Sequence, residues 1–141
     1  CNMVKLAIKP FDYMSFYDLN DRPGNTYTAD TLAQIYDSYK KIYFIIGADS
    51  LLYIQDWYHP EYICSHCHLL CANRDNNSAS VLIDQKHFLA DKYGAVIDFI
   101  DVPELPYSST DIRKKVAMGL SVKEDVGEEV EEYIKSRKLY V

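Results

Sequence analysis

The apolar residues of this 141-residue chain alternate between a helical spacing and short continuous runs. Residues 28–40 and 79–93 read as amphipathic helices, the second ending at Gly94. A continuous apolar run near 69–72 and a largely apolar segment at 95–101 predict strands, and the run 42–46 is typical of a strand buried on both faces. Strands that alternate with helices pair in parallel through right-handed crossovers. The pattern therefore predicts an α/β fold with a parallel sheet.

Shorter segments complete this prediction. Further helices are expected near 3–8, 49–54, 60–66, 109–118 and 127–137, and an alternating run at 14–19 predicts one more strand. There is no linker-like, repetitive or low-complexity stretch, so residues 1–141 are expected to form a single domain. The chain opens at Cys1 inside a helical pattern with no capping residue before it, so we expect the domain to be incomplete at its N-terminus.

Composition narrows the class of protein. The hydrophobic fraction of 48% and the charged fraction of 26% are ordinary for a globular domain. A net charge of −6 argues against a nucleic-acid partner, which selects for a basic face. The sequence has no apolar run of membrane-spanning length and no signal-peptide pattern, so a cytoplasmic protein without a membrane partner is expected. The oligomeric state stays open.

The run Tyr107-Ser108-Ser109-Thr110-Asp111-Ile112-Arg113 carries the clearest chemistry. It opens a predicted helix, where free backbone N–H groups and the helix dipole favour an anion. Arg113 follows one turn later and can reach the same anion with a planar set of donors. A plain capped helix is the alternative interpretation, and only other motifs favour a phosphate site over it.

Two upstream segments supply such motifs. Gly47 ends a predicted strand, where a ligand can approach the backbone closely, and the carboxylate of Asp49 can accept hydrogen bonds from a ribose. Trp57, the single tryptophan, lies beside Tyr58 in a predicted loop, where an indole can stack on a flat or cationic ring. For each segment a structural role is the alternative: Asp49 as a helix cap and Trp57 as a packing anchor.

The segments YTADTL, FIIGADSLL, WYHPE, ANR and SSTDIR occur in this order. Together they closely resemble the bacterial nicotinate mononucleotide adenylyltransferase family, from about residue 3 to the C-terminus. The resemblance implies a Rossmann-like nucleotidylyltransferase fold. It also implies transfer of the adenylyl group of ATP, with Mg²⁺, to nicotinate mononucleotide, which gives nicotinate adenine dinucleotide and pyrophosphate.

The resemblance assigns roles residue by residue. It implies that Arg113 is catalytic by stabilising phosphate charge, and that Thr28, Trp57 and Tyr58 hold the acceptor, with the aromatic residues against the pyridine ring. The residues expected to bind ATP are Gly47, Asp49, Arg74, Ser108, Ser109, Thr110 and Arg113.

Three departures from the family pattern matter. The family begins with a Gly-x-Phe-Asp-Pro-x-His-x-Gly-His loop whose His pair binds ATP phosphates, and these residues contain no such loop. The loop at Arg74 lacks the prolines usual beside it, and Tyr107 stands where an Ile is common. The 141 residues alone are therefore expected to have little activity, and a non-catalytic nucleotide-binding fragment is the second hypothesis.

A Cys/His cluster supports a third hypothesis. Cys64, His66, Cys67, His68 and Cys71 include zinc-ligand residue types with one Cys-x-x-Cys spacing. A structural zinc site usually needs a second, distant ligand pair, and buried cysteines also act as small apolar residues. Reduced thiols in a core are the favoured interpretation, so no metal site is predicted, with a zinc-supported interaction module as the alternative.

Overall fold

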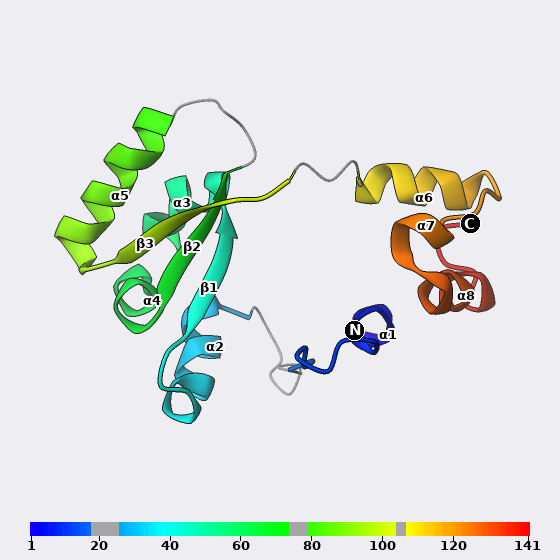
Figure 1. The fold of residues 1–141 in the computed structure, drawn as a ribbon, viewed down its shortest axis with the longest axis horizontal. Helices are drawn as coiled ribbons and strands as arrows, with labels where there is room; N and C mark the ends of the chain where they lie inside the picture. Colours follow the sequence, from blue (N-terminus) through cyan, green and yellow to red (C-terminus); the bar gives the residue numbers. More distant parts are fainter. Residues whose placement is uncertain (18–25, 74–78, 104–106) are drawn as a thin grey trace. The chain divides into compact units, whose positions relative to one another are not determined.

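The computed structural model describes residues 1–17, 26–73, 79–103 and 107–141. They form two compact units, which are described one at a time. One unit comprises Cys1–Asp18 with Leu105–Val141, and the other comprises Leu19–Glu104. Figure 1 shows that the described strands all belong to the second of these, and that the first contains helices.

The Leu19–Glu104 unit is built on three parallel strands, β1 (Tyr43–Gly47), β2 (His68–Asn73) and β3 (Val96–Asp101), in the order β1-β2-β3. Tyr43 pairs with His68, and His68 pairs with Val96. The helices between the strands are α3 (Ala48–Tyr53), the 3₁₀ turn η2 (Ile54–Asp56), α4 (Pro60–His66) and α5 (Ala79–Tyr93). The parallel α/β prediction is confirmed for this unit.

One face of the sheet carries the core of this unit (Figure 1). Alternate strand residues such as Ile46, Leu69 and Ile97 are buried against apolar side chains of α3, α4 and α5. On the other face Ile45 is 66% exposed. The prediction that 42–46 is buried on both faces is therefore wrong. In the described part of the chain β1 is an edge strand, and its Ile46 shares the core cluster with Leu51 of α3, whereas Ile45 lies outside that cluster.

The helix predicted at 28–40 is shorter than expected. α2 runs over Thr28–Ile35 and continues as the 3₁₀ turn η1 (Tyr36–Ser38). Leu32 is its last buried residue, and Asp37 and Ser38 favour local bonding over helix. The residue that caps α2 is Tyr27, and Thr28 is the first helical residue.

The other unit contains α1 (Asn2–Ile8), α6 (Ser109–Ala117), α7 (Lys123–Val126) and α8 (Glu128–Ser136). α1 packs on α8, where the Asn2 amide donates to the Tyr133 hydroxyl at 3.1 Å. The helix α7 was not predicted, because four residues are too short for a periodic signal. No described helix of either unit has the length and apolar character needed to cross a bilayer.

The strand predicted at 14–19 is wrong over 14–17, and 18 and 19 lie outside the described residues. A strand is stable only when a neighbouring strand pairs with it, and all the described strands lie in the other unit. Met14 and Tyr17 are exposed, and the Lys5 ammonium lies 4.8 Å from the centre of the Phe16 ring.

Candidate functional site

A cavity of about 340 Å³ in the Leu19–Glu104 unit brings together the three residues predicted to hold the acceptor. Thr28 lines it from the first turn of α2, and Trp57 and Tyr58 line it from the loop between η2 and α4. The remaining lining residues are Thr26, Tyr27, Asp56 and Ile63. The cavity is therefore mostly aromatic and aliphatic, with hydroxyl groups and one carboxylate at its wall.

Aromatic contacts shape this cavity. The rings of Tyr27 and Tyr58 lie 4.5 Å apart at an interplanar angle of 34°. Trp57 is half-buried and meets Phe44 of β1 edge-on, with ring centres 6.3 Å apart. Trp57 thus has a packing role as well as a place on the cavity wall. Tyr27 was missed as a lining residue, although it opens the YTADTL segment that singled out Thr28.

The backbone after Trp57 is held in an uncommon shape. His59 adopts the left-handed conformation, with φ 51° and ψ 58°, and Pro60 then starts α4. Such a conformation costs of order 1–3 kcal/mol outside glycine, so surrounding contacts must maintain it. The His59 ring lies edge-on to Tyr58 at 4.1 Å, and its Nδ1 lies 2.9 Å from a Glu61 carboxylate oxygen. This bond lowers the pKa of Glu61 and ties the loop to α4.

Gly47 and Asp49 stand at the carboxyl end of β1, away from the lining of that cavity. Gly47 has ordinary extended angles, φ −80° and ψ 163°, so strain does not require glycine there. A Cβ built on Gly47 would meet no atom within 4 Å, so packing does not require glycine either. The open space beside the backbone leaves room for a ligand. Asp49 is exposed in the first turn of α3.

The Ser108–Arg113 residues belong to the other compact unit. Ser108 is the N-cap of α6 and makes no side-chain capping bond, while Ser109 and Thr110 are exposed in its first turn. Arg113 is also exposed, and its guanidinium carbon lies 5.6 Å from the centre of the Tyr140 ring. Arg74 lies outside the described residues.

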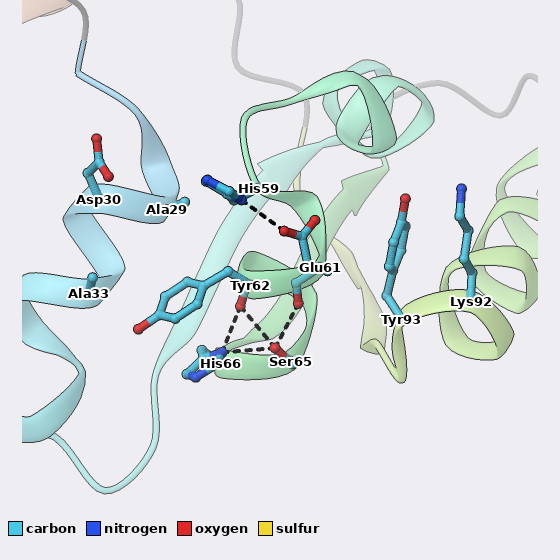
Figure 2. Close-up of a pocket in the computed structure, with 10 residues that line it drawn as sticks. All are labelled: Ala29, Asp30, Ala33, His59, Glu61, Tyr62, Ser65, His66, Lys92 and Tyr93. Carbon is cyan, nitrogen blue, oxygen red and sulfur yellow. Dashed lines mark hydrogen bonds and ion pairs between the residues drawn. The ribbon is translucent and has the colours of Figure 1, made fainter.

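A second cavity, of about 600 Å³, lies among α2, α4 and the end of α5 (Figure 2). The rings of Tyr62 and His66 stack there at 3.8 Å, and the Ser65 hydroxyl donates to the Glu61 carbonyl at 2.7 Å. His59 also reaches this cavity, so the loop after Tyr58 borders both cavities. None of the residues predicted to bind substrate lines it.

The cysteines of the Cys/His cluster are buried in the core of the same unit. Burial raises the pKa of Cys64 to about 11 and that of Cys67 to about 12. The Cys67 thiol donates to the Ile63 carbonyl at 3.1 Å. Zinc needs thiolates, which this environment disfavours. Among the described residues no group of three or more His, Cys, Asp or Glu is placed to hold a metal ion.

Comparison with known proteins decides the family. Residues 1–115 match the family described as cytidylyltransferase-like. The "probable nicotinate-nucleotide adenylyltransferase" of Lachnoclostridium phytofermentans is 34% identical over 143 aligned positions, which cover 99% of this chain and 72% of the relative. The protein of the same name from Caldicellulosiruptor bescii is 35% identical, over 98% of this chain and 70% of the relative. The chain belongs to the nicotinate-nucleotide adenylyltransferase family.

Membership in this family agrees with the fold. The nicotinic acid mononucleotide adenylyltransferase of Plasmodium falciparum, solved with APC, superimposes with a TM-score of 0.70 at 18% identity. The alignment covers 99% of this chain and 73% of that chain. At this identity the likeness supports the fold alone, and it confirms the Rossmann-like nucleotidylyltransferase class that the sequence predicted.

Proposed function

We propose that the protein takes part in adenylyl transfer from ATP to nicotinate mononucleotide, with nicotinate adenine dinucleotide and pyrophosphate as products. The observation that carries the proposal is the joint lining of one cavity by Thr28, Trp57 and Tyr58. These residues come from two motifs more than twenty positions apart in the sequence. Family membership supports the reaction, and the aromatic cavity supports a flat heterocyclic acceptor.

In this proposal the pyridine ring of the acceptor enters the Trp57 cavity. A pyridinium ring beside tyrosine and tryptophan faces gains a cation–π contribution of about 0.5–2 kcal/mol. Thr28 lines the cavity, and its hydroxyl can donate to the nicotinate carboxylate. An amide in place of the carboxylate would lose a charge-assisted hydrogen bond, so the acid form is the preferred acceptor.

ATP is proposed to bind through Gly47, Asp49, Arg74 and the first turn of α6. Open space beside Gly47 and exposed hydroxyl groups at Ser109 and Thr110 support this assignment. Arg113 is proposed to neutralise charge on the transferring phosphoryl group. Mg²⁺ is proposed to accompany the ATP phosphates. Mg²⁺ usually keeps several of its waters when it binds with substrate phosphates, so it needs few protein ligands.

Fluorescence of the single tryptophan tests the acceptor assignment. Nicotinate mononucleotide should quench the Trp57 emission in a saturable way, because a ring in the cavity contacts the indole. Nicotinamide mononucleotide should bind more weakly, and cytidine monophosphate, which lacks a pyridine ring, is the control. Equal quenching by all three nucleotides, or no saturable quenching by nicotinate mononucleotide, would overturn the proposed acceptor.

A further inference from the structure

Tyr140 meets the proposed phosphate-binding arginine within a single compact unit. The guanidinium carbon of Arg113 lies 5.6 Å from the centre of the Tyr140 ring, within the range of a cation–π contact. Arg113 is exposed on α6, and an exposed arginine has many rotamers of similar energy. An aromatic ring within this range of the guanidinium restricts that freedom.

The backbone around Tyr140 has an uncommon left-handed conformation at two residues. Lys138 and Tyr140 both have positive φ, 50° and 63°. Such a conformation is unfavourable in a residue other than glycine, so local contacts must support it. Leu139, between them, donates its N–H to the Ile134 carbonyl at 3.0 Å, and it lines a cavity with Val116 of α6. Leu139 therefore anchors the turn that brings Tyr140 back to α6.

Tyr140 also lies near the start of α6. It lines a cavity of about 430 Å³ together with Ser109, Ile112 and Arg113. Ser109 is in the first turn of the helix, where the backbone N–H groups lack intrahelical partners. The ring is therefore close to both parts of the proposed phosphate site.

We propose that Tyr140 is a positioning residue that holds the Arg113 guanidinium beside the first turn of α6. The inference rests on the proposed role of Arg113 in binding ATP. Stacking uses the face of the guanidinium, whereas its five N–H donors lie in its plane. The contact with Tyr140 thus orients the group and leaves its donors available for phosphate oxygens.

The same unit offers a matched control. The guanidinium carbon of Arg137 lies 5.8 Å from the Tyr133 ring, so this pair makes a contact of the same kind on α8. Neither residue belongs to the proposed site. Loss of this second contact also removes the hydrogen bond that the Tyr133 hydroxyl accepts from Asn2, so it should cost at least as much stability but leave ATP binding unchanged.

The test measures binding of Mg-ATP to the 141-residue chain by calorimetry in four variants and a double variant. Arg113→Ala should weaken binding more than tenfold, as expected for loss of a charge-assisted bond. Tyr140→Leu should weaken it about two- to fivefold, the range of an exposed cation–π contact. Tyr140→Phe keeps the ring and should bind as the native chain does, as should Tyr133→Leu. The double variant Arg113→Ala/Tyr140→Leu should bind no worse than Arg113→Ala.

A structural readout accompanies the binding data. The Arg113 Nε–H resonance should shift upfield in the native chain and in Tyr140→Phe, and the shift should vanish in Tyr140→Leu. No saturable Mg-ATP binding, or normal binding by Arg113→Ala, would remove the proposed role of Arg113 and the inference with it. Weakening by Arg113→Ala with native binding by Tyr140→Leu would overturn the positioning role alone. Equal weakening by Tyr140→Leu, Tyr140→Phe and Tyr133→Leu would also overturn it.

Discussion

The Trp57 cavity and the start of α6 are constructed in contrasting ways. The cavity rests on the core of its unit, where Ile63 forms part of its wall and is 0% exposed. The helix α6 has no buried residue, and Ser109, Thr110 and Arg113 are exposed. A flat ring is selected by shape, which needs packed walls, whereas a phosphate is held by charge and donors, which need only orientation. The contrast therefore matches the two ligands that we propose.

Both regions are expected to bind substrate, but neither is expected to support turnover by itself. Neither includes the histidine pair expected in this family, because the sequence contains no His-x-Gly-His. We expect the 141-residue chain by itself to bind both substrates but to release pyrophosphate far more slowly than about 1 per second, a typical enzymatic rate. A pyrophosphate-release assay checks this. Turnover near that rate would contradict this expectation and show that the His-x-Gly-His loop is not required.

The difference in packing predicts a difference in stability. Ile63→Ala should lower the free energy of unfolding by about 2–5 kcal/mol, because it opens space in a fully buried core. Ile112→Ala removes the same atoms from a half-buried position on α6 and should cost clearly less. Urea denaturation of both variants measures the two effects. Equal losses would show that the two regions are packed alike and would end the contrast.

Trp57→Phe separates the two substrates. The smaller ring should weaken nicotinate mononucleotide binding by about 0.5–2 kcal/mol, the range of a cation–π contact, and leave Mg-ATP binding unchanged. Calorimetry replaces fluorescence here, since the variant has no tryptophan. If both affinities fall together, the role of Trp57 is structural, through its contact with Phe44, and not specific to the acceptor.

The sequence predicted most of the fold because the long elements have clear periods. α5 and its end at Gly94, with φ 69°, match the prediction, as do the three strands. Exposure of Ile45 could not be predicted, since an apolar run has the same pattern whether one face or two are covered. The strand at 14–19 failed because alternation alone does not identify a pairing partner.

The candidate site was less predictable than the fold. The motifs led to Thr28, Trp57 and Tyr58, and the cavity adds Tyr27 and Asp56, whose place depends on how two segments fold together. Tyr140 was missed for a related reason. Its contact with Arg113 depends on two left-handed residues at Lys138 and Tyr140, for which no glycine gave a signal.

Polar contacts contribute to the stability of the unit that contains α6, as the apolar core does in the Leu19–Glu104 unit. The Glu131 carboxylate accepts hydrogen bonds from the Ser121 hydroxyl at 2.7 Å and the Val122 N–H at 2.8 Å. The bond from Ser121 and the bond from Lys135 are the main reasons that the pKa of Glu131 is lowered to about 2. Such a carboxylate stabilises the fold fully above its ordinary pKa of 4.5.

Stability from Glu131 should therefore decline as the pH falls from about 4.5 towards 2. Glu131→Gln should melt several degrees lower at pH 7, and its melting temperature should depend less on pH across that window. The exposed neighbour Glu132→Gln is the control and should keep the native profile. Thermal melts recorded by circular dichroism at several pH values measure both. Parallel profiles for the native chain and Glu131→Gln would exclude this carboxylate as the source.

The smallest effect is expected at the three buried cysteines of the Leu19–Glu104 unit. Because burial raises the pKa of Cys64 and Cys67 to about 11 and about 12, these thiols should stay protonated and bind little zinc at pH 7. Protein purified without a His-tag should contain far less than one zinc per chain, and chelation should leave its melting temperature unchanged. A thiol reagent should modify the exposed Cys1 quickly and the three buried cysteines only after unfolding. Stoichiometric zinc, with a drop in melting temperature on chelation, would instead favour a metal-supported core.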